Sequence, residues 1–343
     1  MRSRSAERPC SSRPARLPLT NLSAVIEAAA AFAAIAGHAT VRGLLESQLK
    51  SARLPHAYLF VGEPGLGKTL FARALASALL PERDLDRHPD YWEDDRQQTL
   101  KLDEIRLLPD KGPEFHDQTL QAFLSLKPAI GRGRVALITN VGRIPDQTQG
   151  ILLKTLEEPH PSQVLILTTP SVSPFVVLPT VVSRCQRVSF HPVPLPEVGR
   201  LLVDRGVPED RAALLAQLSR GRPGWALQAA RDDTVVERHR HWRGRLEQLF
   251  GAPADVALGL AAEVDSANFG WRGGDRSGED PALFAVSSWQ LVLRERMVAD
   301  IRSAKAVWAR LLELSYDTIG YLEQNVSPRL ALECFLLEAR HAA

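Results

Sequence analysis

Cysteine and long apolar runs are both scarce in this chain of 343 residues. The three cysteines, Cys10, Cys185 and Cys334, lie far apart and form no CxxC pair. This spacing argues against a disulfide framework or a four-cysteine zinc module and fits a reducing compartment. The longest apolar stretch, residues 22–36, is about 15 residues long, mostly alanine, and contains Glu27, so it is too short and too weakly apolar to span a bilayer.

An excess of charge of either sign is also missing. The chain has 42 basic and 40 acidic residues, a formal net charge of +2, which implies no large basic surface for covering DNA. Only seven of the basic residues are lysine, which we interpret as genome composition. Hydrophobic residues make up 45% and charged residues 24%, which excludes fully disordered, collagen-like and multi-span membrane proteins. At about 150 residues per domain, the length predicts roughly two to three domains.

The N-terminus carries five arginines within residues 1–16, followed by an alanine-rich stretch. This pattern loosely resembles a signal or transit peptide. Against that interpretation, Glu27 interrupts the apolar region, and residues 62–69 fit G-x-x-x-x-G-K-[ST], a phosphate-binding pattern that requires cytosolic ATP. We therefore expect a cytoplasmic protein in which residues 1–32 form a partly disordered extension or follow from a misassigned start codon.

From residue 54 the pattern alternates between strand and helix. The predicted strands are 58–61, 135–139, 164–169 and 186–190, and the predicted helices between them are 70–80 and 146–158. Residues 81–98 are polar and predict an irregular surface excursion. Strands that alternate with helices predict a parallel sheet with helices on both faces.

A proline-rich joint at residues 191–196 precedes a purely helical pattern, which we divide near residue 232 into a small helical domain and a bundle. Residues 269–280 are rich in Gly, Asp and Arg and predict a loop. The predicted helices are 197–205, 208–219, 223–231, 233–250, 253–264, 282–300, 303–320 and 328–340.

The clearest chemical motif is Gly62-Glu63-Pro64-Gly65-Leu66-Gly67-Lys68-Thr69, which fits G-x-x-x-x-G-K-[ST] between a predicted strand and a predicted helix. Gly65 and Gly67 allow the backbone to wrap closely, so that N–H groups and the helix N-terminus point at phosphate oxygens. Lys68 would neutralise the β and γ phosphates, and the Thr69 hydroxyl would bind Mg²⁺. A plain glycine turn would not require the Lys-Thr pair, so we predict nucleotide binding.

A P-loop ATPase also needs a carboxylate at the end of a neighbouring strand, to hold Mg²⁺ and polarise water. The candidate strand, 135–139, continues into Asn140-Val141-Gly142-Arg143, and no Asp or Glu occurs from Arg132 to Pro145. The sequence therefore predicts a phosphate cradle that is intact and hydrolytic machinery that is disabled.

The order of three motifs resembles the AAA+ clamp-loader ATPases: the P-loop, LLKTLEEP at residues 152–159, and SRC at residues 183–185. Within that family the chain is most similar to the delta-prime subfamily of the bacterial DNA polymerase III clamp loader. The resemblance covers about residues 33–230, and beyond them only the helical character agrees. The other matching segments are 35–38, 54–58, 88–90, 123–128 and 178–180.

The resemblance implies a fold with three parts. Residues 33–191 form an α/β P-loop AAA+ domain, a parallel sheet with flanking helices, and residues 192–232 form a small helical lid domain. Residues 233–343 form an all-α collar for oligomerisation, in which we expect the apolar stripe of Phe284, Trp289, Val292 and Leu293 to need a partner face.

The resemblance also implies partners and a trans-acting residue. Members assemble with motor (gamma/tau) and delta subunits into a ring-like pentamer that opens a sliding clamp and places it on primed DNA, with no membrane involved. The SRC arginine, here Arg184, is an arginine finger that reaches the ATP of the adjacent motor subunit, while Ser183 and Cys185 shape the turn. Taken alone, a single arginine is usually a solvated charge. His38 and His56 would flank the adenine side of the pocket or serve a structural role.

Departures from the family pattern point to a stationary subunit. Residues 80–100 contain no cysteine, so we predict no zinc, and no metal site of the protein's own beyond the Mg²⁺ that accompanies ATP. Gly224 stands where motor subunits carry an arginine for the γ-phosphate, although Arg222 is close by, and Gly150-Ile151 replaces the usual Asn-Ala before LLKTLEEP. The acidic Walker B positions are occupied by Thr139, Asn140 and Gly142.

These observations favour a non-motor subunit of the DNA polymerase III holoenzyme that helps to load the clamp in DNA replication. It binds ATP with Mg²⁺ without hydrolysing it, and Arg184 acts on a neighbour. Two alternatives stay open. One is a gamma/tau-like motor that takes its carboxylate from Glu157 or Glu158, which are otherwise solvated structural residues. The other is a stand-alone nucleic-acid-binding protein, against which the near-zero charge and the lack of aromatic-basic interleaving weigh.

Overall fold

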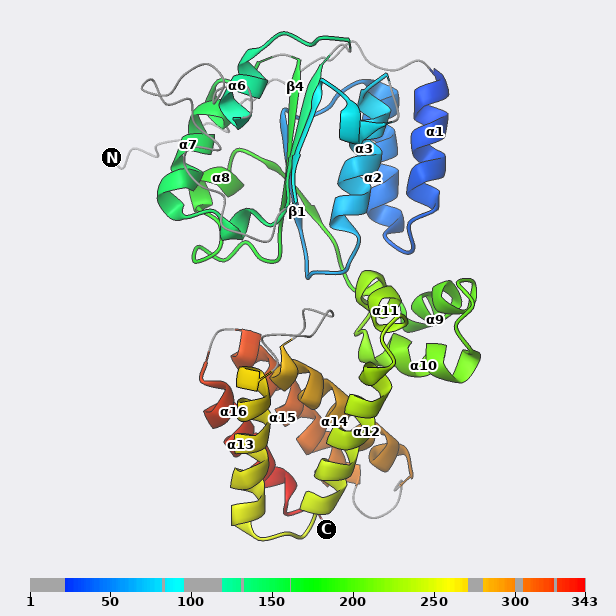
Figure 1. Ribbon diagram of the computed structural model, residues 1–343, viewed down its shortest axis with the longest axis vertical. Helices are drawn as coiled ribbons and strands as arrows, with labels where there is room; N and C mark the ends of the chain where they lie inside the picture. The colour runs from blue at the N-terminus through cyan, green and yellow to red at the C-terminus, as the bar shows by residue number, and fades with distance from the viewer. Residues whose placement is uncertain are drawn as a thin grey trace, which may run out of the picture. The chain divides into compact units, whose positions relative to one another are not determined.

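The structure is a computed structural model that forms two compact units, Met1–Pro194 and Leu195–Ala343 (Figure 1). The first unit is α/β and the second is helical, and the break between them lies close to the boundary predicted at residue 191. The residues that the structure describes are 22–81, 84–95, 119–130, 133–160, 162–270, 280–299, 305–323 and 326–342.

A five-stranded parallel sheet forms the centre of the first unit, in the order β2-β3-β4-β1-β5. Every residue of β1, β3 and β4 is buried, because helices cover both faces of the sheet, and this explains why these strands read as continuous apolar runs. The strands are β1 (Ala57–Val61), β2 (Tyr91–Asp94), β3 (Arg134–Ile138), β4 (Gln163–Thr169) and β5 (Gln186–Ser189).

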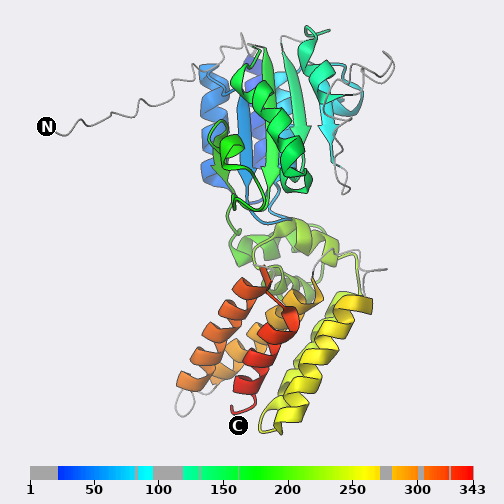
Figure 2. The same ribbon diagram turned by 90° about the vertical axis from the view of Figure 1, so that its left-hand side faces the viewer.

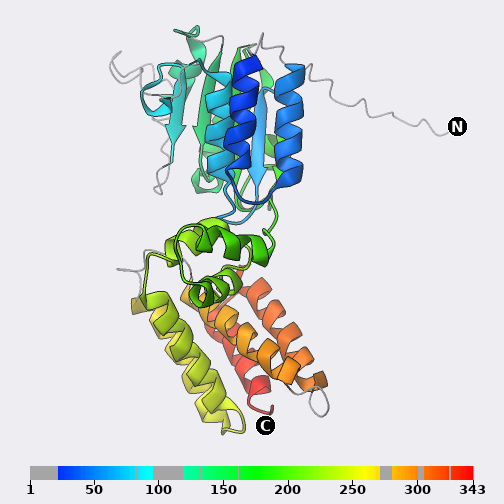
Figure 3. The same ribbon diagram turned by 90° about the vertical axis from the view of Figure 1, so that its right-hand side faces the viewer.

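Two sets of helices sandwich the sheet (Figures 1 and 2). Tyr58 and Phe60 of β1 belong to the core on the side of the first set, which Figure 3 shows in front of the sheet, and Leu59 belongs to the core on the other side. This arrangement confirms the predicted parallel sheet with flanking helices. The first set is α1 (Leu22–Ala33), α2 (Ala39–Ser51) and α3 (Lys68–Leu79), and the second is α6 (Leu120–Ser125), α7 (Asp146–Glu157) and α8 (Pro179–Val182).

The prediction of an irregular excursion over residues 81–98 is wrong, because β2 and the short 3₁₀ helix η1 (Leu85–Arg87) lie within it. β2 is a short polar edge strand that pairs only with β3, so it lacks the apolar run that identifies a buried strand. A buried carboxylate just before it, Asp90, accepts the N–H groups of Ala129 and Ile130 at 2.6 and 2.9 Å. Asp90 also lies 3.6 Å from the Arg134 guanidinium, and this network fixes the edge of the sheet.

Helix α1 begins inside the segment that the sequence assigns to an N-terminal extension, residues 1–32. Its Phe32 is fully buried and stacks on Phe71 of α3, with 5.6 Å between the ring centroids. The α/β unit therefore includes residues before the predicted start at 33. The expectation of disorder over residues 1–21 lies outside the described residues.

The second unit is entirely helical in its described residues, as predicted. Its helices from residue 234 onward pack against one another as a bundle (Figure 1), and the division between lid and collar near residue 232 stays a prediction. Helix α13 continues to Gly270, into the loop predicted at 269–280, and residues 271–279 lie outside the described part. The helices are α9 (Leu195–Val203), α10 (Glu209–Leu218), α11 (Pro223–Ala229), α12 (Thr234–Leu249), α13 (Ala254–Gly270), α14 (Pro281–Ala299), α15 (Lys305–Glu323) and α16 (Pro328–Ala339).

The expectation that the apolar stripe of α14 needs a partner chain is wrong. Trp289 is fully buried within the unit, stacks on Phe335 of α16, and donates its indole N–H to the Trp242 carbonyl at 2.8 Å. Helices of the same chain cover the stripe, because a helix that is apolar on a wide face becomes the centre of a bundle. All four predicted residues, Phe284, Trp289, Val292 and Leu293, are buried. No helix in the described ranges is long and apolar enough to cross a membrane.

Candidate nucleotide site and surface arginine

The predicted P-loop joins the carboxyl end of β1 to the N-terminus of α3. Its glycines adopt backbone angles that other residues disfavour, with φ of 153° at Gly62, 84° at Gly65 and 89° at Gly67. A Cβ atom on Gly62 would lie 2.6 Å from the Phe190 carbonyl oxygen. The N-cap of α3 is Gly67, which has no side chain to cover the free N–H groups of the first turn. Free N–H groups at a helix N-terminus are suited to an anion, so this end of α3 fits the predicted phosphate site.

Lys68 lies inside this loop and is buried. Its ammonium donates to the Gly62 carbonyl and to the Glu63 carbonyl, the latter at 2.8 Å. Burial lowers the pKa of Lys68 to about 8, and the negative charge of Glu63 opposes that decrease. The loop therefore holds a cation where phosphate oxygens would bind, at a cost in desolvation that an anionic ligand would offset.

The two histidines that the sequence assigns to the pocket lie at opposite ends of β1. His38 contacts the P-loop: its Nε2 atom is 2.8 Å from the Leu66 carbonyl, and its ring meets Phe190 edge-on. His56 precedes the first residue of β1, where burial lowers its pKa and a backbone group of Leu156 interacts with the ring. Of the two roles considered for His56, its position favours the structural one.

The position expected for a hydrolytic carboxylate follows β3 and contains Thr139 and Asn140. The Asn140 N–H donates to the Thr168 hydroxyl at 2.8 Å, which ties the ends of β3 and β4 together. A carboxylate that sequence reasoning missed, Asp94, ends the neighbouring strand β2 at this edge, but it is buried and pairs with Arg143 at 2.9 Å. Asp94 could have been identified from its position at the end of β2. The sequence did not predict that strand, so Asp94 was missed.

Arg184 lies two residues beyond α8 and is about one third exposed, at 35%. One terminal nitrogen lies 2.7 Å from a carboxylate oxygen of Glu157, the last residue of α7. The other donates to the Thr180 carbonyl at 3.0 Å and to the Ser183 hydroxyl at 3.4 Å. The structure thus joins the LEEP and SRC motifs, which the sequence places apart.

Arg184 lies at the end of the sheet opposite to the P-loop. Gln186, the first residue of β5, pairs with Tyr58 near the start of β1, whereas the P-loop follows Val61 at the other end of β1. A parallel strand rises about 3.3 Å per residue, so β1 alone places the start of the P-loop more than 10 Å from Tyr58, the residue that pairs with Gln186. Arg184 therefore cannot serve the P-loop of its own chain.

Arg222, which the sequence considers as a substitute for the missing γ-phosphate arginine, is engaged within its own unit. It is buried, its Nε–H donates to the Ser219 carbonyl at 2.8 Å, and its guanidinium lies 5.6 Å from the ring centroid of Trp225. These contacts are those of a structural residue.

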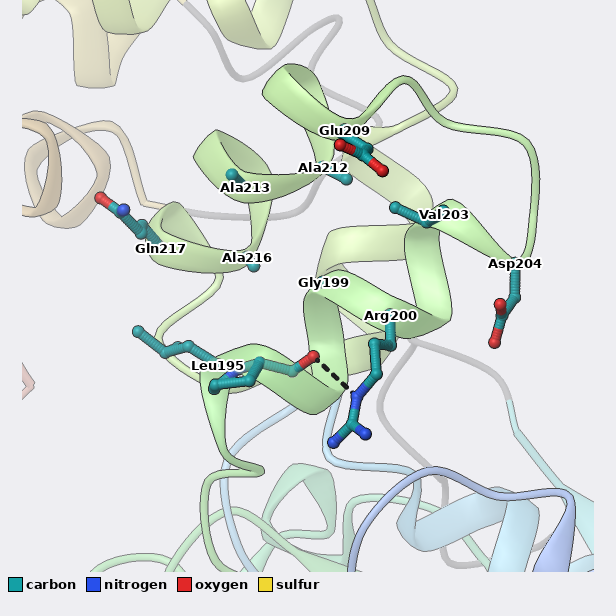
Figure 4. A pocket seen from close by; sticks show the side chains of 11 residues that line it. Leu195, Gly199, Arg200, Val203, Asp204, Glu209, Ala212, Ala213, Ala216 and Gln217 are labelled. Atoms are coloured by element: carbon teal, nitrogen blue, oxygen red, sulfur yellow. Dashed lines mark hydrogen bonds between the residues drawn. The ribbon is translucent and has the colours of Figure 1, made fainter.

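A separate cavity of about 470 Å³ lies between α9 and α10 (Figure 4). Small residues such as Gly199, Ala212 and Ala216 line it, with Asp204 and Glu209 among the remaining lining residues. Arg200 also lines the cavity, so its lining is mostly small and apolar, with two carboxylates and one guanidinium.

No group of three or more His, Cys, Asp or Glu side chains within the described ranges is arranged to hold a metal ion. Cys185 of the SRC motif is a free thiol whose pKa burial raises to about 12, in keeping with a structural role in the turn. The absence of zinc stays a prediction.

The residues around the P-loop fit a nucleoside triphosphate with Mg²⁺. The glycine backbone and the free N–H groups of α3 suit phosphate oxygens, Lys68 supplies a cation, and Thr69 in the first turn supplies a hydroxyl. In the described residues, β3 and β4 are followed by no carboxylate that could activate water, since Thr139 and Asn140 follow β3 and Ser171 lies just beyond β4, and Asp94 at the end of β2 is paired with Arg143.

Comparison with known proteins gives a consistent result. The family model described as "DNA polymerase III, delta subunit" matches residues 37–194. The DNA polymerase III subunit tau/gamma of Haemophilus influenzae is 30% identical over 55% of this chain and 29% of its own length. The delta-prime subunit of Bacillus subtilis is 27% identical over 57% of this chain and 60% of its own length, and that of Pseudomonas aeruginosa is 28% identical over 49% and 52%.

Among solved structures, a gamma subunit-related protein of DNA polymerase III from Thermotoga maritima aligns with 83% of this chain and 94% of its own. The TM-score is 0.43 and the sequence identity 19%. The match with this chain spans 60% or less of the length of each of these three curated relatives.

Proposed function

We propose that this chain is a non-motor subunit of the DNA polymerase III clamp loader, of the delta-prime kind, and the match of residues 37–194 to the family model and the similarity to two delta-prime subunits support this. It binds ATP with Mg²⁺ at its P-loop without hydrolysing it, and it supplies Arg184 to the ATP of a neighbouring motor subunit. Its partners are the motor (gamma/tau) and delta subunits, and through them the sliding clamp and primed DNA.

The observation that carries the proposal is the location of Arg184 at the end of the sheet opposite to its own P-loop. A partly exposed guanidinium there has no phosphate of its own chain to serve, yet it is available to a subunit packed against that edge. A guanidinium placed on the charge that builds up on a transferring phosphoryl group is worth about 10³–10⁵ in rate where measured in GTPases.

The nucleotide site of this chain supports a role without hydrolysis. Thr139 and Asn140 take the place of the carboxylate that polarises water, and Arg143 neutralises the carboxylate of Asp94 nearby. Arg222, the candidate for a γ-phosphate contact from the helical unit, is held by Ser219. Phosphate binding needs the P-loop alone, whereas hydrolysis also needs the carboxylate that polarises water and the arginine that contacts the γ-phosphate. A chain with only the P-loop would therefore bind ATP without hydrolysing it.

The motor alternative, with Glu157 or Glu158 as the catalytic carboxylate, is not supported by their positions. Both lie at the end of α7, next to the segment that enters β4 at its amino end, so β4 lies between them and the carboxyl edge of the sheet. Glu157 is in addition paired with Arg184.

The test is to measure binding and turnover on the purified chain. A fluorescent ATP analogue with Mg²⁺ should bind, and Lys68→Ala should abolish binding, while phosphate release stays at the level of the Lys68→Ala protein. Mg²⁺-dependent turnover that Lys68→Ala removes would show a motor instead. Absence of nucleotide binding to the folded chain would show that the P-loop is a relic.

A further inference from the structure

Two motifs that the sequence presents separately meet through one ion pair. Glu157 belongs to LEEP at the end of α7, and Arg184 belongs to SRC just beyond α8. The two helices lie side by side on the same face of the sheet (Figure 1). Their packing, in which Leu156 and Val181 are buried in one core, fixes the distance between the two backbones. The 2.7 Å contact between carboxylate and guanidinium is therefore a product of the fold and not of sequence proximity.

The contacts of Arg184 leave part of its guanidinium available. The group has five N–H donors, and three acceptors are engaged: the Glu157 carboxylate, the Thr180 carbonyl and the Ser183 hydroxyl. The side chain is partly exposed, so the remaining donors can reach a ligand from outside. Glu157 belongs to α7 and Thr180 to α8, so these two contacts fix the plane of the Arg184 guanidinium. A single hydrogen bond would leave the group free to rotate.

The value of this arrangement lies in orientation. A free arginine side chain loses rotamer entropy when it is fixed in one position. Both partners of the pair are partly exposed, Glu157 at 52%, so the ion pair adds little to the stability of the fold. Instead, the ion pair restricts the guanidinium before a phosphate of the neighbouring subunit binds. This lowers the entropic cost of placing Arg184 on that phosphate in the transition state.

We propose that Glu157 is a positioning residue for Arg184, which holds the guanidinium ready for the ATP of the neighbouring subunit. The inference rests on the proposed trans role of Arg184. Glu157 itself touches no nucleotide and contributes no charge to the reacting phosphate. Removing its side chain therefore reduces the rate only when Arg184 is present.

A double-mutant cycle in the reconstituted complex tests this. The chain is assembled with the motor and delta subunits from the same genome, and ATP turnover stimulated by clamp and primed DNA is measured for four versions: wild type, Glu157→Ala, Arg184→Ala and the double variant. Glu157→Ala should lower kcat about threefold to tenfold, which corresponds to about 0.7–1.4 kcal/mol of ordering that the ion pair no longer provides in advance. KM for ATP should stay the same. In the Arg184→Ala background the second change should have no effect.

Two further variants separate positioning from a general loss of charge. Glu157→Gln keeps an oxygen that accepts from Arg184 and should retain more of the rate than Glu157→Ala. Glu158→Ala removes the same charge from the adjacent exposed residue and should leave turnover at the wild-type level. Gel filtration of each complex verifies that assembly is intact.

Three results would overturn the inference. A higher rate with Glu157→Ala would mean that the pair restrains Arg184 instead of preparing it. An equal loss with and without Arg184 would mean that Glu157 acts elsewhere. An Arg184→Ala complex that turns over ATP at the wild-type rate would overturn the proposed trans role itself, and with it the role of Glu157.

Discussion

Replacing Lys68 by methionine should stabilise the folded chain at neutral pH while it removes nucleotide binding. Methionine matches the length and the apolar stem of lysine, so it fills the same space in the P-loop without a charge. In the wild-type chain the ammonium is buried, and only the two P-loop carbonyls and the nearby charge of Glu63 offset its desolvation. The P-loop thus keeps a buried cation at the expense of stability.

The size of the effect follows from the pKa of Lys68. Burial lowers that pKa from 10.5 to about 8, which at about 1.4 kcal/mol per pKa unit corresponds to roughly 3 kcal/mol. Below pH 8 both the folded and unfolded states carry the proton, so the full penalty applies. Between pH 8 and 10.5 the unfolded state binds more protons than the folded state, so the stability of the wild type rises with pH. Above pH 10.5 the penalty is gone.

Urea denaturation of the wild type and Lys68→Met from pH 7 to 10.5 measures this directly. The stability advantage of Lys68→Met should shrink by roughly 3 kcal/mol across that range. Tyr58 and Tyr91, whose pKa values burial raises, contribute equally to both proteins and cancel in the difference. Lys50→Met, at an exposed lysine, is the matched control and should show no such change. A difference between wild type and Lys68→Met that is independent of pH would refute the reasoning.

Other parts of the molecule give further expectations. Trp289→Ala should destabilise the helical unit by about 3–5 kcal/mol in chemical denaturation, because it leaves a large cavity in the bundle. A much smaller loss would indicate that a partner chain is needed to cover that face. Asp90→Ala should cost about 3–5 kcal/mol, because Arg134 loses the carboxylate beside it in the interior, and a change below 1 kcal/mol would argue that the network does not hold β2. At pH 8 a thiol reagent should modify the exposed Cys334 well before Cys185, because the raised pKa of Cys185 leaves little thiolate, and comparable rates would contradict its burial.

The P-loop could be predicted residue by residue because its chemistry is contiguous: glycines set the backbone, and Lys68 and Thr69 follow at fixed positions. The buried strands were equally visible, since a strand covered on both faces reads as an unbroken apolar run. Both patterns are local, so they can be recognised from the sequence alone.

What the sequence could not show depends on contacts between distant residues. β2 is polar and lies at an edge, and its place in the sheet is fixed by Asp90 and residues some forty positions later. The stripe of α14 looked like an interface because periodicity reveals an apolar face but not which chain covers it. The pair of Glu157 and Arg184 required the packing of α7 beside α8, which no spacing rule contains.

The most direct test of the account compares Lys68→Met with Arg184→Ala in the assembled complex, where ATP turnover stimulated by clamp and primed DNA is measured for each. If this chain serves the nucleotide of a neighbour and not its own, Arg184→Ala should lower turnover while Lys68→Met leaves it near the wild-type rate, and Arg187→Ala, at an exposed residue of β5, should match the wild type. Turnover that falls with Lys68→Met and is unchanged with Arg184→Ala would contradict the account.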